Sequence, residues 1–200
     1  MKGSIAGLFV VASLVAAGHV HAQEMTPTPG RLELSLIPGG GTWFTDNDDA
    51  PGFGNYDAGV AAAYNFSRIF GVEGEVAGAF GLEQELNSAF GERTSPNILS
   101  YTGNLVAHWT RYSFVPYATG GIGGLSVFER SDVSIASGET YFSGNVGGGL
   151  KWLAPNGRWG LRGDYRFVMI RGKDNSSTFF GTDNRYANRV YGALVINVIK

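Results

Sequence analysis

Residues 158–170 read RWGLRGDYRFVMI, and two kinds of side chain alternate along the segment. One set is apolar or small and consists of Trp159, Leu161, Gly163, Tyr165, Phe167 and Met169. The other set carries the charge and consists of Arg158, Arg162, Asp164 and Arg166. A period of two places these sets on opposite faces of a β-strand, whereas a helix would mix them. The segment therefore predicts a strand with one apolar face and one charged face.

The same two-residue period recurs along the chain after residue 30 and predicts eight strands. We place them at residues 31–43, 55–66, 69–80, 98–110, 114–128, 140–154, 158–170 and 186–199. The connections alternate between tight turns at 67–68, 111–113 and 155–157 and long polar loops at 44–54, 81–97, 129–138 and 171–185. Such sorting is typical of outer-membrane barrels, with short turns in the periplasm and long loops outside. The sequence predicts an all-β fold, an eight-stranded antiparallel up-and-down transmembrane β-barrel over residues 31–200.

The positions of the aromatic residues indicate which strand faces meet lipid. One predicted ring beside the short turns consists of Phe66, Phe70, Trp109, Phe114, Trp152 and Trp159. A second ring beside the long loops consists of Trp43, Tyr56, Phe80, Tyr101, Phe128, Phe142, Phe167 and Tyr186. Two aromatic girdles about ten residues apart match the span of a tilted transmembrane strand. We therefore predict that the apolar faces point outward and the charged faces inward.

On this phasing, charged side chains of both signs line the barrel lumen. The acids are Glu33, Asp57, Glu73, Glu75 and Asp164, and the bases are Lys151, Arg158, Arg162, Arg166 and Arg189. Eight strands leave an interior just wide enough for side chains to fill, and charges buried there need partners of opposite sign. The equal numbers predict a structural network in which Glu73 and Glu75 pair with arginines, namely Arg162, Arg166 or Arg189. An ion path along these charges is the alternative.

The N-terminal residues read as a targeting segment. Lys2, an apolar run over 5–17 and the small-x-small site at 20–22 predict a signal peptide over residues 1–22, followed by an extended lead-in over 23–30. Without Lys2 the chain carries 14 basic and 17 acidic residues, a balance that argues against nucleic acid as a partner. The chain has no cysteine, so a core or a membrane must hold the exported fold together. The mature part has no apolar run long enough for a helical span.

Signals for catalysis and metal binding are weak. His108 is the only histidine left after processing and lacks the His-x-Ser spacing of lipid A deacylase barrels, so we interpret it as an ordinary lumen residue. The three aspartates within 46–49 lack the twelve-residue calcium pattern. Phe179 and Phe180 either contact a partner or pack against neighbouring loops. We predict no catalytic residue, no cofactor and no metal.

Residues 142–152 (FSGNVGGGLKW) and 159–167 (WGLRGDYRF) resemble the outer-membrane β-barrel-domain family, which includes the OmpA transmembrane domain and OmpX-like proteins. Pro116 and Tyr117 before a glycine-rich run add to the likeness, which covers the whole mature chain. One departure is the ending Val198-Ile199-Lys200, where such barrels usually end in an aromatic residue that the assembly machinery reads. The resemblance implies the Gram-negative cell envelope and no single activity, because members variously stabilise the envelope, adhere or bind small ligands.

We therefore expect a non-enzymatic, OmpA-like integral protein of the outer membrane, a scaffold that presents four extracellular loops for envelope stabilisation, adhesion or surface interaction. Three alternatives stay open. A porin-like barrel that binds or passes a small apolar molecule or ions would be favoured by an interior groove lined by Val106, Leu153 and Val168. A lipid-modifying enzyme would lose activity on His108→Ala, and a soluble lipocalin-like binder would stay monomeric without detergent. The expected partners are outer-membrane lipid, lipopolysaccharide and the outer-membrane assembly machinery, and we expect a monomer.

Overall fold

The computed structural model describes residues 30–46, 50–85, 92–109, 113–128, 139–155, 157–173, 180 and 182–198. The predicted signal peptide and residues 23–29 of the predicted lead-in lie outside the described residues. Within the described ranges, no helix is long and apolar enough to cross a membrane.

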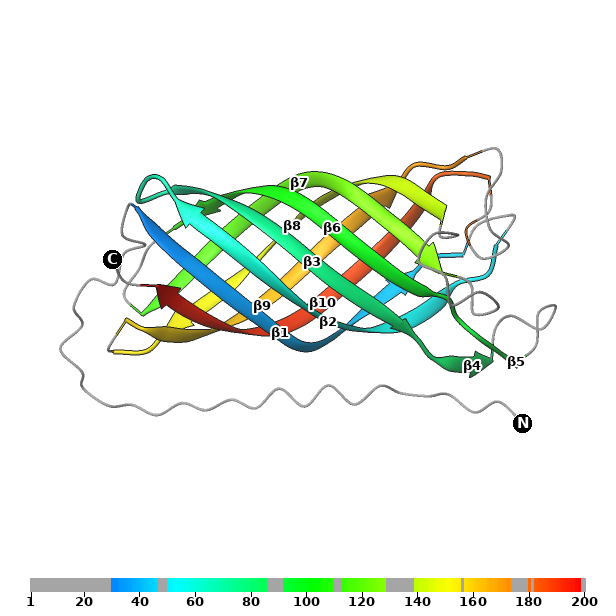
Figure 1. Ribbon diagram of the computed structural model, residues 1–200, viewed down its shortest axis with the longest axis horizontal. Coiled ribbons are helices and arrows are strands. Elements are labelled where there is room, and N and C mark those ends of the chain that lie inside the picture. The colour runs from blue at the N-terminus through cyan, green and yellow to red at the C-terminus, as the bar shows by residue number, and fades with distance from the viewer. Residues whose placement is uncertain are drawn as a thin grey trace.

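The main element is a closed barrel of eight strands. They are β1 (Arg31–Phe44), β2 (Phe53–Asn65), β3 (Phe70–Gly81), β6 (Asn97–His108), β7 (Phe114–Phe128), β8 (Glu139–Leu153), β9 (Trp159–Ile170) and β10 (Arg185–Val198). The order around the barrel is β1-β10-β9-β8-β7-β6-β3-β2, and every neighbouring pair is antiparallel. Figure 1 shows the tilted strands, with the strand ends that the short turns join at the left-hand end and the strand ends that the long connections join at the right-hand end. This confirms the predicted architecture.

The strand boundaries lie within two residues of the predicted ones, and one small element was not predicted. A two-stranded sheet of β4 (Glu83–Glu85) and β5 (Glu92–Thr94) stands in the connection between β3 and β6. The Gln84 side chain joins it to the start of β2, because it accepts from Gly54 N at 2.9 Å and donates to Gly54 O at 2.8 Å. The hairpin is three residues long on each side and largely polar, so it carries too little apolar periodicity to be recognised.

The apolar strand faces point away from the barrel interior. Leu161, Val146 and Ile122 are more than half exposed, and the alternation of exposed and buried side chains runs along each of the eight strands. A soluble protein would bury these faces, since large contiguous apolar surfaces are not left in water. Apolar side chains outside and charged side chains inside are the arrangement of a barrel whose solvent is lipid.

A β-bulge in β1 changes which residues face inward. The register shifts between Leu36 and Gly39 on the β10 side, and between Ile37 and Gly40 on the β2 side. A Cβ at Gly40 would lie 2.5 Å from the Cβ of Tyr191, so only glycine fits there. Before the bulge the odd-numbered residues are buried, and after it Thr42 is buried while Trp43 is exposed. The extra residue therefore turns Trp43 toward lipid and Thr42 toward the lumen.

Candidate functional site

A buried lysine–glutamate pair lies in the lumen at the short-turn end. Lys151 of β8 donates to Glu33 of β1, and Asn65 at the end of β2 donates to the second oxygen of Glu33 at 2.7 Å. His108, at the end of β6, places its Nε2 atom 3.2 Å from Lys151 Nζ. All four side chains are buried, so the acid and the base satisfy each other away from water.

Arg162 of β9 forms the next layer. Its guanidinium binds Glu73 of β3, and its Nη2 atom lies 2.6 Å from Asp164 Oδ2. Its Nε atom donates to the Tyr117 hydroxyl at 2.7 Å, and that hydroxyl donates to Asp164. Gly149 makes room for this arrangement, because a Cβ there would lie 2.5 Å from the Tyr117 hydroxyl oxygen. The partners in this layer thus come from two strands, β3 and β7, besides β9, which carries Arg162 and Asp164.

Arg166 of β9 connects this layer to the one above it. Its Nη2 atom lies 2.8 Å from Glu73 Oε1 and 3.2 Å from Glu75 Oε2, and its Nε atom lies 3.0 Å from Asp164 Oδ1. The same Nη2 atom donates to the Tyr191 hydroxyl at 2.9 Å, which in turn donates to Glu75 at 2.9 Å. One guanidinium thus bridges three carboxylates, an arrangement suited to the planar arginine fork.

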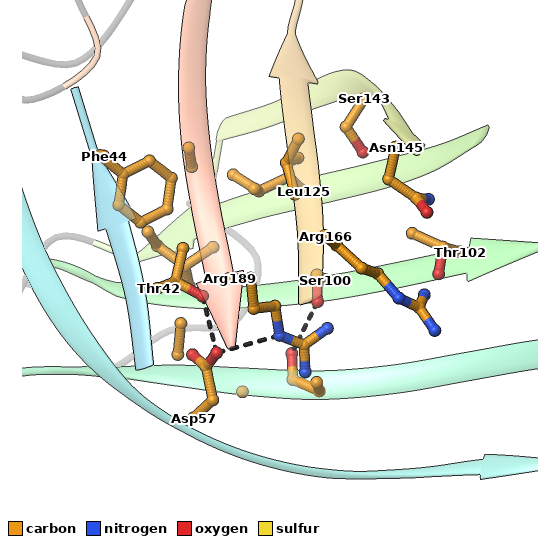
Figure 2. Close-up of a pocket in the computed structure, with 16 residues that line it drawn as sticks. Thr42, Phe44, Asp57, Ser100, Thr102, Leu125, Ser143, Asn145, Arg166 and Arg189 are labelled. Atoms are coloured by element: carbon orange, nitrogen blue, oxygen red, sulfur yellow. Dashed lines mark hydrogen bonds and ion pairs between the residues drawn. The ribbon is translucent and has the colours of Figure 1, made fainter. Parts of the chain in front are cut away.

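Arg189 of β10 completes the network toward the long-loop end. It binds Glu75, and its Nε atom lies 2.9 Å from Asp57 Oδ2. Thr42 donates to the same Asp57 oxygen at 2.7 Å, and Figure 2 shows the chain Thr42–Asp57–Arg189. The bulge in β1 is what brings Thr42 to this position.

The structure places nine of the ten predicted lumen charges inside the barrel, and these nine are the ones in the layers above. Arg158 is the exception, and its placement in the lumen was wrong. It lies before the start of β9, at the short-turn rim of the barrel, and its side chain is exposed. Arg185 is a buried basic residue that was not predicted, because the sequence analysis placed it in the loop over residues 171–185. Arg185 opens β10, is buried, and donates to the carbonyl of Pro51.

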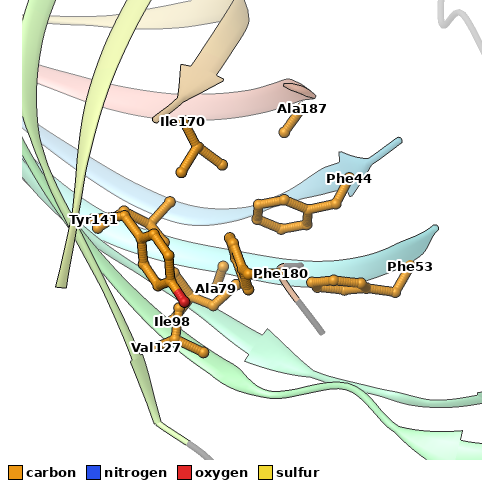
Figure 3. Packing of buried hydrophobic residues seen from close by; sticks show 10 residues of the cluster. Phe44, Phe53, Ala79, Ile98, Val127, Tyr141, Ile170, Phe180 and Ala187 are labelled. Carbon is orange, nitrogen blue, oxygen red and sulfur yellow. The ribbon is translucent and has the colours of Figure 1, made fainter. Parts of the chain in front are cut away.

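The long-loop end of the lumen is filled by apolar side chains that the sequence interpretation did not assign. This apolar cluster consists of Phe44, Phe53, Ala79, Ile98, Leu125, Val127, Tyr141, Ile170, Phe180 and Ala187. Phe180 comes from the connection between β9 and β10, and Figure 3 shows its ring between Tyr141 and the pair formed by Phe44 and Phe53. Of the two alternatives for Phe180, contact with a partner or packing within the protein, the structure supports packing within the protein. The sequence contains a signal for this cluster, because the two-residue alternation puts the apolar residues Leu125 and Val127 on the same inward face of β7 as Tyr117.

A small cavity separates the ionic network from the apolar cluster. Its volume is about 40 Å³. Residues from both sides line it, among them Asp57, Asn145, Phe44 and Leu125 (Figure 2). A water molecule needs roughly 10–15 Å³ of such volume. The cavity therefore has room for a few waters.

The three residues whose common groove would favour the small-molecule alternative do not come together. Val106 and Leu153 are buried but do not belong to the apolar cluster, whereas Val168 packs against it. Val168 pairs with Asn145, and Leu153 lies eight residues further along β8. At about 3.3 Å per residue these side chains are at opposite ends of the lumen.

The fourteen predicted girdle residues lie on outward positions. Those that are exposed are Trp43, Tyr56, Phe66, Phe70, Phe80, Tyr101, Trp109, Phe114, Phe142, Trp159 and Tyr186. Phe128, Trp152 and Phe167 are half-buried at outward register positions. Trp152 contacts Trp159 edge-on at a centroid distance of 5.5 Å, and Phe167 stacks on Tyr186 at 5.6 Å. These two pairs stand at opposite ends of the barrel.

The outward apolar band and the inward ionic network define a class of protein, the small eight-stranded transmembrane barrel of the outer membrane. The family described as "Outer membrane protein beta-barrel domain" matches residues 8–192, and the chain belongs to this family. Its location is the outer membrane.

Solved structures of other small barrels share the fold. Neisserial surface protein A has 12% sequence identity and a TM-score of 0.57, over 83% of this chain and 95% of that one. The attachment invasion locus protein Ail of Yersinia pestis has 16% identity and a TM-score of 0.52, over 86% and 100%. The N-terminal β-barrel domain of Pseudomonas aeruginosa OprF has 10% identity and a TM-score of 0.52, over 85% and 98%. The comparison with curated proteins gives no match.

Proposed function

We propose that this barrel is a non-enzymatic envelope scaffold with a closed lumen, which anchors its long connections at the cell surface. The observation that carries the proposal is the buried network of Glu33, Asp57, Glu73, Glu75 and Asp164 with Lys151, Arg162, Arg166 and Arg189. Its members come from β1, β2, β3, β8, β9 and β10 and cross the lumen. Such a network stabilises one arrangement of strands and blocks the interior at the same time.

Two further features support a closed lumen. The apolar cluster closes the long-loop end above the network, and the cavity between them holds only about 40 Å³. An ion would have to break several buried ion pairs and then cross an apolar layer. Each step is costly, since charges in a low-dielectric interior lose their hydration.

The position of His108 argues against a lipid-modifying enzyme. His108 is buried next to Lys151 inside the short-turn end, and its ring does not face the lipid surface where a lipid substrate would approach. We propose that its role is to fill the lumen. Lipid A hydrolysis by purified wild-type protein, lost on His108→Ala, would contradict this.

Planar-bilayer recordings test the closed lumen. Folded wild-type protein should give no stable unitary conductance. The Phe180→Ala variant should also give no stable unitary conductance, because the ionic network remains beneath the shortened side chain. A heated and an unheated sample on a gel would verify that the inserted protein is folded. Steady channels from the folded wild type would refute the closed scaffold.

Cysteine labelling tests which end faces outward, and the chain has no native cysteine to interfere. Lys173 and Arg68 are both exposed, the first beyond the long-loop end of β9 and the second in the short turn between β2 and β3. A membrane-impermeant maleimide should label Lys173→Cys on intact cells and leave Arg68→Cys unlabelled until the cells are lysed. The opposite pattern would show that the long connections face the periplasm.

A further inference from the structure

The apolar cluster at the long-loop end is a chamber whose walls and occupant come from different parts of the chain. The walls belong to strands of the barrel, and a single aromatic ring from the β9–β10 connection, that of Phe180, lies inside them. Its ring stacks on Tyr141 at a centroid distance of 5.0 Å and contacts Phe44 and Phe53 edge-on at 5.5 Å and 6.1 Å. Since no barrel strand carries Phe180, its side chain can leave the chamber without the loss of a ladder hydrogen bond.

The chamber continues into the small cavity beneath it. Five residues line both, namely Phe44, Ala79, Ile98, Leu125 and Ala187. Displacement of the Phe180 ring would vacate the volume of one benzene ring, and this volume would add to the cavity of about 40 Å³ beneath it. A cavity of roughly 150 Å³ with apolar walls is sufficient for benzene.

The floor of this joined space is polar. Asp57 Oδ1, Asn145 Oδ1 and Arg189 Nη2 are buried and lack a hydrogen-bond partner within the described part of the chain, and their residues line the cavity. Two of these atoms accept and one donates. A hydroxyl group suits such a floor, because it can donate to an acceptor and accept from the guanidinium. Apolar walls with a few convergent polar groups are the usual composition of a small-molecule site.

Arg185 adds a preference for an aromatic ligand over an aliphatic one. Its guanidinium lies 5.0 Å from the centroid of Phe53 and 5.5 Å from that of Phe180. A ring that takes the place of Phe180 inherits this cation–π contact, which a saturated ring of the same size cannot make.

We propose that this chamber is a binding site for a compact phenolic molecule, which enters from the long-loop end, takes the place of the Phe180 ring and points its hydroxyl at Asp57, Asn145 and Arg189. Phe180 occupies the site when no ligand is bound. The proposal goes beyond a closed scaffold, because the ionic network stays intact beneath the bound molecule.

Phenol binding to isoleucine-labelled protein in lipid nanodiscs tests the proposal by methyl NMR. Ile98 and Ile170 line the chamber and are buried, whereas Ile122 and Ile196 face lipid and report only partition into the bilayer. Wild type should show saturable shifts at Ile98 and Ile170 and only non-saturable drift at the two outer methyls. Phe180→Ala should bind phenol at least tenfold more tightly, since no side chain has to be displaced. The matched control is Phe142→Ala, an exposed phenylalanine on β8, which should behave as wild type.

Two other ligands test the assigned chemistry. Toluene lacks the hydroxyl and should bind about fivefold more weakly than phenol, the worth of one hydrogen bond. Cyclohexanol keeps the hydroxyl without the π-face and should bind roughly two- to fivefold more weakly. Saturable shifts in Phe180→Ala alone would reveal an engineered cavity and overturn the proposal. Equal drift at all four methyls would overturn it too. Conductance is a separate measurement, so a failed site and a failed scaffold would be distinguished.

Discussion

Replacement of Lys151 by methionine isolates the contribution of the lumen ion pairs, because Lys151 has the simplest environment among them. Its partner Glu33 makes one ion pair within the described residues, the one to Lys151. The side chains of Lys151 and Glu33 are 3% and 7% exposed. Lys151→Met therefore leaves a buried carboxylate without its ion-pair partner, and Asn65 remains its hydrogen-bond donor.

The magnitude follows from the burial. Exposed ion pairs contribute about 0–1 kcal/mol, whereas loss of one partner of a buried pair costs about 3–5 kcal/mol. We expect Lys151→Met to lower the free energy of unfolding by about 4 kcal/mol. The double variant Lys151→Met/Glu33→Gln should lose about 1 kcal/mol or less, because a neutral amide replaces the stranded charge and still accepts from Asn65. The double variant should thus recover about 3 kcal/mol of the stability that Lys151→Met alone loses.

Equilibrium urea unfolding and refolding in lipid vesicles measures these values, with tryptophan fluorescence and the gel shift of the folded form as two probes. Arg68→Met is the matched control, because Arg68 is exposed in the turn after β2 and should change stability by less than about 0.5 kcal/mol. A double variant as unstable as Lys151→Met, or a Lys151→Met no less stable than the control, would refute the buried-pair argument.

Three further outcomes are expected. Arg162→Leu should cost about 3–5 kcal/mol in the same unfolding assay, and Arg68→Leu less than about 0.5, because only the first removes a buried partner from two carboxylates. Gly149→Ala should destabilise the barrel by about 1–3 kcal/mol, because its Cβ would meet Gly163 O at 2.1 Å and the Tyr117 hydroxyl at 2.5 Å. Gly163→Ala, whose Cβ would meet nothing within 4 Å, should be nearly neutral; equal effects would contradict the packing. Unheated folded protein should migrate differently from heated protein on a gel, and identical migration together with solubility in plain buffer would contradict the barrel.

The sequence alone was sufficient for the barrel, since a strand places alternate residues on opposite faces whatever its neighbours are. Residues 158–170 show the principle most clearly, because Arg162, Asp164 and Arg166 had to share one face and Leu161 and Tyr165 the other. Turn lengths then determined which strand ends lie together. The sequence analysis named Arg162 and Arg166 as possible partners of Glu73, and both form ion pairs with it in the structure.

Strand ends were beyond such reasoning, because enclosure depends on how far the neighbouring strands extend. In the two-residue alternation, Arg158 falls on the inward face of its strand, but it lies at the rim. Arg185 follows a polar stretch typical of a loop, but it is the first residue of β10. The bulge in β1 is a similar case. Strict alternation from Glu33 would place Trp43 inside, and the close approach of Gly40 to Tyr191 is visible only in three dimensions.

What the sequence determined, then, is the sidedness of each strand, because sidedness is a local property of the extended backbone. Only the tertiary structure decided which charges meet across the lumen, which side chains close its outer end, and that Phe180 enters from a connection to lie against Tyr141. These contacts join residues from separate strands and connections, and their geometry depends on the shear and tilt with which the barrel closes.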